Sequence, residues 1–203
     1  MIMSQDTDPT TDPRYRVLTP SQGPGPYASM TLMYDGAENG VAPGTPGAVR
    51  VTGRVVDGAE RPITAPDVLI EVLQGDQFVR TLTDDAGEFA FTVRKPEPTR
   101  LADGRLQAPF FHVILHVFPL PELHRTRLYF ADETEANSAD PLLSYLDDED
   151  GRTLLAAPDD GGYRWEIRLS GERQTAFLVS LGEPSLLDGG ETPSRPFREQ
   201  LSV

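Results

Sequence analysis

Short runs in which apolar and polar residues alternate fill the middle of the chain. In residues 49–56, valines alternate with arginine and threonine until the run stops at an Asp-Gly pair at 57–58. The same alternation returns in residues 89–93, directly after an Asp-Asp-Ala-Gly turn at 84–87. Successive side chains of a strand point to opposite faces, so this pattern is typical of a half-buried strand. It predicts strands joined by tight hairpins.

Further segments along the chain carry a strand pattern. Residues 110–118 are apolar on both faces, as expected of a central strand. Only residues 140–145 and their neighbours look helical, with Asn137 or Ser138 as a possible cap before Pro141. Short strands separated by frequent turns favour a β-sandwich. We therefore predict an all-β fold: a β-sandwich of about eight mostly antiparallel strands with a long N-terminal arm and one short helix. The expected strands are residues 49–56, 68–73, 78–83, 89–93, 110–118, 125–130, 163–169 and 175–181.

Glycine and proline mark the two ends of the chain as different from its middle. The sequence holds 18 glycines and 19 prolines, which read as turn residues because they follow no short period. Residues 1–48 are rich in Gly, Pro and Thr, and the last 22 residues are again rich in Gly, Pro and charge. We expect an N-terminal arm over 1–48, a sandwich over 49–181 and a C-terminal tail over 182–203.

Charge and composition exclude several classes of function. The 203 residues include 32 acidic and 18 basic side chains, a net charge of −14, and no cysteine. Such a chain lacks the basic face that nucleic acids and anionic membranes require. Disulfides, thiolate metal ligands and a cysteine nucleophile are excluded as well. Residues 1–14 do not resemble a secretory signal, and no apolar run approaches ~18 residues, so we expect a soluble cytoplasmic protein.

The candidate catalytic groups form no complete set. On a strand, His112 and His116 share a face but lie about 13 Å apart, too far to bind one metal ion together. We expect them to have polar partners in the sheet or at an interface. The carboxylates near 132–140 and at 147–150 lack calcium-loop spacing, and we interpret the second group as a solvated loop. A self-sufficient hydrolase has no nucleophile–base pair to support it.

Several motifs, taken in order, resemble the intradiol ring-cleavage dioxygenases. The most specific are TPSQGPGPY at 19–27 and TRLYF at 126–130, the latter followed by Asp132-Glu133 and Ala136-Asn137. The resemblance runs from about residue 19 to residue 177. Weaker motifs that support it stand at 53–58, 68–74, 83–89, 108–109, 141–143, 153–156, 163–168 and 171–177.

This resemblance implies an iron enzyme whose iron site is lost in this chain. The family opens a catechol ring with O2 at a non-haem Fe(III) held by two tyrosines and a His-x-His pair. Counting back from the TRLYF motif places Phe110 at the first histidine and His112 at the second. No tyrosine occurs between Tyr34 and Tyr129. The resemblance therefore implies a non-iron, alpha-type subunit with vestigial ligand positions, and a beta-type partner that binds the Fe(III) in a hetero-oligomer of αβ units.

The resemblance also implies residues that face the partner. Gly25, Pro26 and Tyr27 of the arm, together with Arg127, match positions that form the wall of the partner's substrate pocket. A guanidinium there could hold the carboxylate of a small aromatic acid or orient the tyrosine ligands of the iron. Two other interpretations stay open: Arg127 could form an ion pair with an acidic residue at 132–135, and Tyr27 could pack on its own domain.

A stand-alone binding or scaffold module is the alternative for the whole chain. Transthyretin-like and carboxypeptidase-regulatory-like sandwiches share the hairpin pattern of residues 53–58 and 83–89. They do not account for the TPSQ arm or for the TRLYF motif.

Overall fold

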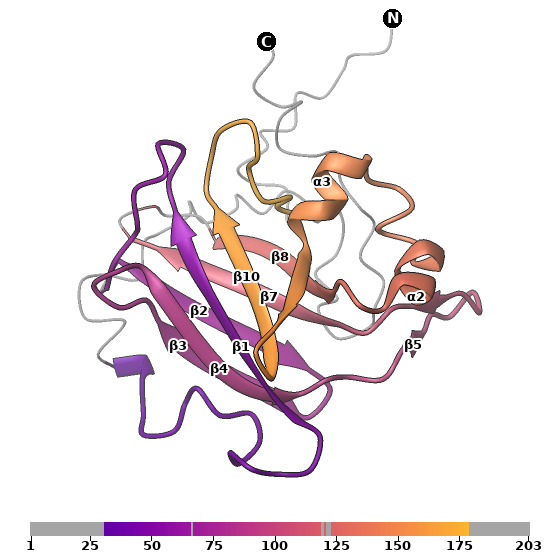
Figure 1. Cartoon of the computed structure of the whole chain (residues 1–203), viewed down its shortest axis with the longest axis horizontal. Coiled ribbons are helices and arrows are strands. Elements are labelled where there is room, and N and C mark those ends of the chain that lie inside the picture. Colours follow the sequence, from indigo (N-terminus) through magenta and orange to yellow (C-terminus); the bar gives the residue numbers. More distant parts are fainter. Residues whose placement is uncertain (1–30, 66, 119, 121–122, 179–203) are drawn as a thin grey trace, which may run out of the picture.

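The computed structural model describes residues 31–65, 67–118, 120 and 123–178 (Figure 1). These residues form a nearly all-strand domain with two short helices. The strands are β1 (Ala48–Val56), β2 (Val68–Gln74), β3 (Gln77–Leu82), β4 (Glu88–Arg94), β5 (Thr99–Arg100), β6 (Leu106–Gln107), β7 (Phe110–Val117), β8 (Leu123–Phe130), β9 (Leu155–Asp159) and β10 (Gly162–Arg168), and the helices are α2 (Thr134–Ala139) and α3 (Asp148–Thr153).

The main sheet has the strand order β3-β2-β7-β8-β9-β10-β1-β4. Its two halves, β3-β2-β7-β8 and β9-β10-β1-β4, are joined by a short parallel contact between β8 and β9. β1 and β10 are also parallel, whereas the other neighbours are antiparallel. The predicted all-β, mostly antiparallel fold is confirmed.

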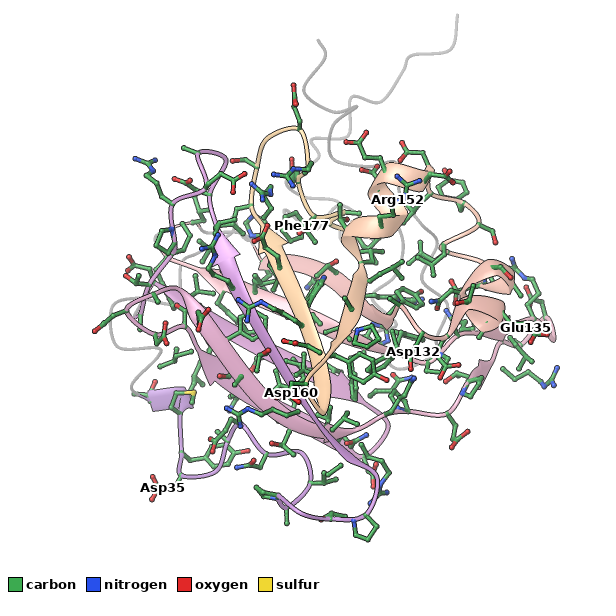
Figure 2. The ribbon with its side chains drawn as sticks, in the orientation of Figure 1. Asp35, Asp132, Glu135, Arg152, Asp160 and Phe177 are labelled. Carbon is green, nitrogen blue, oxygen red and sulfur yellow. The ribbon has the colours of Figure 1, made fainter. Side chains whose placement is uncertain are left out.

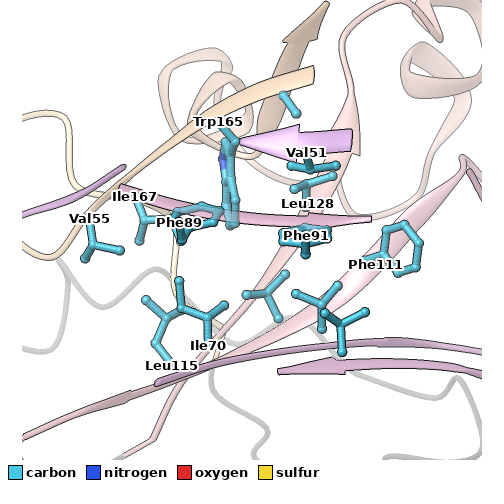
Figure 3. Close-up of a cluster of buried hydrophobic side chains, with 14 of the residues drawn as sticks. Val51, Val55, Ile70, Phe89, Phe91, Phe111, Leu115, Leu128, Trp165 and Ile167 are labelled. Atoms are coloured by element: carbon cyan, nitrogen blue, oxygen red, sulfur yellow. The ribbon is translucent and has the colours of Figure 1, made fainter. Parts of the chain in front are cut away.

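The hydrophobic core lies between the two halves (Figure 3). Each half contributes the inward set of its alternating positions, because residues two apart on a strand share a face. Phe89 and Phe91 of β4 stack with ring centroids 6.2 Å apart, and Phe111 of β7 contacts Phe130 of β8 edge-on. Trp165 of β10 is 3% exposed in the same cluster. The alternation seen in the sequence is therefore the pattern that builds this core.

The free edges of β3 and β4 are bridged by residues 37–40. The amide of Arg80 in β3 donates to the carbonyl of Ala37 at 2.8 Å, and the amide of Gly40 donates to the carbonyl of Thr92 in β4 at 2.8 Å. Ala37 is 1% exposed. This part of the chain therefore packs on the sandwich and nearly closes it into a barrel.

The predicted turn at residues 84–87 forms, but the predicted hairpin there was wrong, because β3 and β4 do not pair with each other and stand at opposite ends of the strand order. Oδ1 of Asp84 accepts the amides of Ala86 and Glu88, both at 2.8 Å. Gly87 has φ = 73°, a conformation that costs a glycine nothing but strains a residue with a side chain. Local turn chemistry thus takes the chain from the edge strand of one half of the sheet to the edge strand of the other.

Three local predictions were wrong. The helix expected over 140–145 forms earlier, at α2, and Asp140 is its C-terminal cap. Two described helices form where one was predicted. Residues 175–178 make no strand, and the remainder of that expected strand lies outside the described residues. The prediction also missed the short strands β5, β6 and β9.

The acidic run 147–150 is a helix start. The side chain of Asp147 accepts the amide of Asp150 at 2.8 Å and so caps α3. Carboxylates are stabilised in the first turn of a helix by the unpaired amides there. Asp150 is only 5% exposed. The interpretation of this run as a loop was therefore wrong, although Asp147, Asp148 and Glu149 are exposed to solvent as expected.

Candidate functional site

The outer face of β7 and β8 brings together the residues singled out by the sequence. Antiparallel pairing sets Phe110 opposite Tyr129 and His112 opposite Arg127. Because paired antiparallel residues share a face, all four side chains lie on the side turned away from the main core. The two vestigial ligand positions and Arg127 therefore belong to one cluster. Residues 25–27 of the arm lie outside the described part of the chain.

Arg127 is buried, with 2% of its surface exposed. Its guanidinium carbon lies 4.1 Å from the ring centroid of Phe110, and its Nη1 donates to the hydroxyl of Tyr129 at 3.1 Å. A cation over an aromatic face is attracted by the ring's quadrupole, and the attraction grows when water is excluded. The ring of His112 in turn meets Phe110 edge-on, with centroids 4.9 Å apart. An aromatic ring and a phenol thus hold the arginine.

Asp140 completes the cluster, and sequence reasoning missed it. It is fully buried, and its Oδ1 accepts the hydroxyl of Tyr129 at 3.2 Å. The same carboxylate accepts the amides of Leu142, Leu143 and Ala108 at 2.9, 3.1 and 2.9 Å. A buried carboxylate needs such donors, since an unpaired charge in the interior is very costly.

A second hydrophobic cluster surrounds these polar groups. It lies on the outer side of β7 and β8, and its apolar members exclude water from the arginine and the aspartate. Its buried members are Ala108, Phe110, Tyr129, Leu142, Leu146, Leu154 and Ala176. Leu142 and Leu146 come from the segment between α2 and α3, and Leu154 directly follows α3.

Tyr129 is a protonated phenol. Burial raises the pKa of its hydroxyl above the ordinary value of 10.0, and the nearby Asp140 carboxylate acts in the same direction, whereas Arg127 opposes both. The hydroxyl donates to Asp140 and accepts from Arg127, so both of its hydrogen-bonding roles are used. It is therefore not a ready metal ligand.

The residues present do not fit the iron of the family. Phe110 has no donor atom, and His112 alone cannot hold Fe(III). Tyr129 is committed to Arg127 and Asp140. Within the described ranges, no group of three or more His, Cys, Asp or Glu side chains could hold a metal ion. Phe110, Tyr129 and the groups around them are packed as a polar and aromatic core.

The space beside the cluster is too small for a substrate. A cavity of about 30 Å³ is lined by His112, Ile114 and Arg125 among others. Such a volume can hold one or two water molecules, whereas ligand pockets usually measure ~300–1,000 Å³. As formed by the described residues, this cavity beside His112 is too small for a catechol ring.

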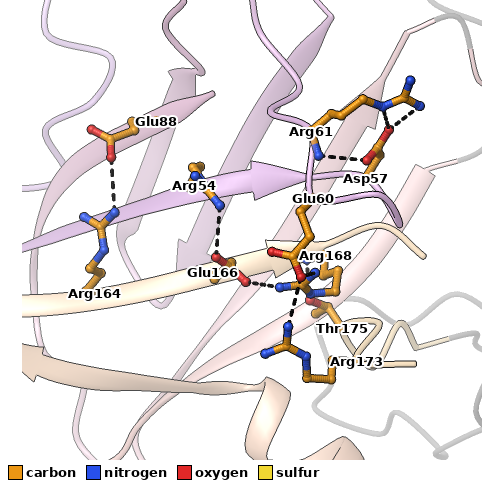
Figure 4. A network of polar contacts seen from close by, with 10 residues as sticks. All are labelled: Arg54, Asp57, Glu60, Arg61, Glu88, Arg164, Glu166, Arg168, Arg173 and Thr175. Carbon is orange, nitrogen blue, oxygen red and sulfur yellow. Dashed lines mark hydrogen bonds and ion pairs between the residues drawn. The ribbon is translucent and has the colours of Figure 1, made fainter. Parts of the chain in front are cut away.

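A larger, polar pocket of about 540 Å³ lies elsewhere, beside β10 and α3. Its most buried charge, Arg168, donates to Glu60 at 2.7 Å and to Glu166 at 2.6 Å (Figure 4). Arg173 donates to the same Glu60 at 2.9 Å. These contacts neutralise two of the arginines that line the pocket. Of the site residues that the structure describes, Phe110, His112 and Arg127 do not line it.

The acidic residues that follow β8 pair with Lys95 and not with Arg127. Nζ of Lys95 lies 2.6 Å from Glu133 and 3.1 Å from Asp132, and it donates to the hydroxyl of Tyr163 at 3.1 Å. Asp132 stands directly before α2 in Figure 2. The network therefore links the end of β4, the start of α2 and β10. The ion pair considered for Arg127 with these two carboxylates does not form.

The remaining histidines have structural contacts, as expected from the sequence. Nε2 of His116 lies 2.9 Å from Oε2 of Glu71, and Arg80 donates to the other oxygen of Glu71 at 2.7 Å. The hydrogen bond with His116 and the one from Arg80 hold the pKa of Glu71 below its usual value, although burial opposes them. The ring of His124 contacts Phe177 edge-on.

None of the helices within the described residues is long and apolar enough to cross a membrane. No protein-family model matches the chain. Curated proteins do match it, among them two alpha chains. The chain is 32% identical over 193 residues to the protocatechuate 3,4-dioxygenase alpha chain of Pseudomonas putida, and the match covers 79% of this chain and 95% of that one. It is 34% identical over 129 residues to the protocatechuate 3,4-dioxygenase alpha chain of Burkholderia cepacia, covering 61% of this chain and 64% of the relative.

Solved structures share the fold. The intradiol ring-cleavage dioxygenase from Tetranychus urticae gives a TM-score of 0.51 at 13% identity, covering 64% of this chain and 84% of that chain. Hydroxyquinol 1,2-dioxygenase from Pseudomonas putida DLL-E4 gives a TM-score of 0.50 at 17% identity, and the match covers 65% of this chain and 59% of that chain. At these identities the likeness establishes a common architecture.

Proposed function

Since the chain belongs to the intradiol ring-cleavage dioxygenases and is related to the alpha chains of protocatechuate 3,4-dioxygenase, we propose that it is the non-iron, alpha-type subunit of such an enzyme. A beta-type partner holds the Fe(III) and cleaves protocatechuate with O2 to 3-carboxy-cis,cis-muconate. This chain forms part of the wall of the partner's substrate pocket. The two chains associate as αβ units.

The observation that carries this proposal is the composition of the cluster on β7 and β8. Phe110 stands where a ligand histidine is expected, and a guanidinium stacks on it at 4.1 Å. A chain that had kept its own chemistry would need donor atoms and an open pocket there. The cavity beside the cluster measures only about 30 Å³. The chain therefore acts through a neighbour's site.

In this proposal Arg127 supplies a fixed positive charge to the wall of the shared pocket. The substrate is an anion, and the chain has a net charge of −14, so an uncompensated acidic wall would repel it. Arg127 is 2% exposed, which means that its charge acts from inside the wall with little screening by solvent. Gly25, Pro26 and Tyr27 are the arm residues proposed to line the same pocket.

Co-expression tests the proposal. A gene for an intradiol beta-type chain with a His-x-His pair and two ligand tyrosines is expressed with and without this chain. Together they should yield a coloured tyrosinate–Fe(III) complex that consumes O2 and protocatechuate, whereas this chain alone should show no turnover. Turnover of a catechol by the purified chain alone would contradict the subunit assignment.

The arginine has its own test in the same complex. Arg127→Ala should raise KM for protocatechuate on the order of tenfold, because a charge-assisted contribution is lost, and should change KM for uncharged catechol little. An equal effect on both substrates would refute the role of Arg127 toward the carboxylate.

A further inference from the structure

Two side chains, Phe110 and Tyr129, contact the guanidinium of Arg127, and Asp140 acts on it through Tyr129. Phe110 lies under its plane at 4.1 Å, the Tyr129 hydroxyl accepts from Nη1 at 3.1 Å, and Asp140 accepts the Tyr129 hydroxyl at 3.2 Å. Both Phe110 and Asp140 are at most 3% exposed. These contacts therefore form a buried frame around the arginine.

The outer end of this frame is tied to the backbone. Asp140 accepts the amides of Leu142 and Leu143 just after it and the amide of Ala108 just before β7. Its carboxylate is thus held by two separate segments, and it orients the Tyr129 hydroxyl. A tyrosine whose hydroxyl must donate to Asp140 can offer its lone pairs to Arg127.

We propose that Phe110, Tyr129 and Asp140 are positioning residues for the guanidinium of Arg127, and that the vestigial ligand position 110 now serves as the platform for this arginine. The inference rests on the proposed function, in which Arg127 contributes to a substrate pocket shared with a partner. It assigns a present role to a position whose metal-binding role is lost.

The chemistry explains why a phenyl ring suits this position. The face of a phenyl ring is negative and attracts a guanidinium, whereas a histidine there could become cationic and repel it. A free arginine side chain samples many rotamers, so a guanidinium that must stay at one point benefits from side chains that already hold it there. Each contact narrows the positions that the guanidinium can take.

The chain contains a matched control for the tyrosine. Tyr163 accepts from Lys95 at 3.1 Å and donates to Asp132 at 2.9 Å, so it too bridges a cation and a carboxylate. Tyr129→Phe and Tyr163→Phe each remove one hydroxyl from such a bridge, but only the first touches Arg127. For the platform, Phe111→Leu is the control for Phe110→Leu, because Phe111 is buried on the opposite face of β7.

The experiment measures kcat and KM for protocatechuate and for catechol in the co-expressed complex. Tyr129→Phe and Phe110→Leu should each raise the ratio of the two KM values, protocatechuate over catechol, about three- to tenfold at little cost in kcat. The two control variants should leave the ratio within about twofold. In a chain that already carries Arg127→Ala, Tyr129→Phe should not change the KM ratio further, because the guanidinium that Tyr129 positions is absent.

The outcomes separate this inference from the proposal on which it rests. If Arg127→Ala raises the ratio and neither Tyr129→Phe nor Phe110→Leu does, the positioning role is refuted while the role of Arg127 stands. If Tyr129→Phe has the same effect with and without Arg127, it acts by another route and the inference fails. If Arg127→Ala leaves the KM ratio unchanged in an active complex, the role of Arg127 toward the carboxylate and the positioning role of its neighbours are both refuted. Native mass measurements confirm that each variant still assembles.

Discussion

Phe110 and Arg127 form a stacked pair on the outer face of the sandwich, with 4.1 Å between the guanidinium carbon and the ring centroid. They come from neighbouring strands, β7 and β8, that are set in register by antiparallel pairing. A cation supplied by the chain thus packs on the position that the family resemblance assigns to a metal ligand. The pair is the structural reason to expect that metal binding cannot be regained by one substitution.

Phe110→His should therefore not restore metal binding. The new imidazole would lie beside His112 and under the Arg127 cation, and Tyr129 would still be bonded to Arg127 and Asp140. We expect less than about 0.1 equivalent of Zn²⁺ or iron after incubation and desalting, by elemental analysis, because two imidazoles next to a cation are a poor site. One tightly bound equivalent would show that the ligand set is more complete than the structure indicates.

Tyr129 should make the fold sensitive to alkaline pH. Burial raises its folded-state pKa above 10.0, so the neutral phenol stabilises the fold below pH 10 and this contribution is lost as pH rises further. Tyr129→Phe should lower the free energy of unfolding by about 1 kcal/mol at neutral pH. Above pH 10, the free energy of unfolding should fall less steeply in the variant than in the original chain. Urea unfolding between pH 7 and 11 measures both. Tyr145→Phe, at a tyrosine 56% exposed, is the control, and an unchanged alkaline slope in Tyr129→Phe would contradict the account.

Glu71 should contribute to stability above the acid range. Its hydrogen bond with His116 and that from Arg80 lower its folded-state pKa below 4.5, so its contribution is present above pH 4.5 and lost as pH falls through the folded value. Glu71→Gln should cost about 1 kcal/mol near neutral pH and reduce the loss of stability on acidification. The solvent-exposed pair of Glu88 with Arg164 offers Glu88→Gln as a control of smaller effect. If both variants lowered the free energy of unfolding equally, the claim that Glu71 contributes more than an exposed ion pair would be refuted.

Lys95, the sole lysine of the sequence, should resist amine-directed reagents. Partial burial acts to lower its pKa, but hydrogen bonds with Glu133, Tyr163 and Asp132 outweigh this and raise it. Less of the reactive neutral amine is then present at pH 8. Acylation of Lys95, followed by peptide mass spectrometry, should be at least about tenfold slower in the folded chain than in urea. Glu133→Gln should speed it in the folded chain, and equal rates in both states would contradict the network.

The same network should matter for stability. Lys95→Met leaves Asp132 and Glu133 without their shared cation and should lower the free energy of unfolding by about 1–3 kcal/mol. Lys95→Arg keeps the charge and should recover part of this loss. Thermal unfolding of the three proteins provides the comparison. A melting temperature unchanged in Lys95→Met would mean that the network is too solvated to contribute.

The sequence predicted the parts of this molecule that follow from local rules. Alternation located most of the core strands, and the two-residue period of a strand put His112 and His116 on one face of β7. The sequence did not predict strand β9, because Leu155–Asp159 contains a proline and no alternating pattern. Its strand conformation is specified by pairing with β8 and β10. Residues 175–178 show the opposite error. Their apolar pattern led to a predicted strand, but they pack as irregular chain.

The site residues divide in the same way. Motif spacing identified Arg127 and the loss of the histidine at position 110. It could not identify Asp140, whose role depends on an amide 32 residues earlier, at Ala108, and on a hydroxyl from β8. No periodicity encodes such a contact, because only the assembled fold brings these groups together.

Native mass spectrometry with iron analysis of the co-expressed complex tests the central claim most directly. If this chain is a non-iron subunit, intact particles should contain it and the beta-type partner in equal numbers, with one iron per pair. After separation under mild conditions, the iron should stay with the partner chain. Iron recovered with this chain, or two irons per pair, would contradict the account.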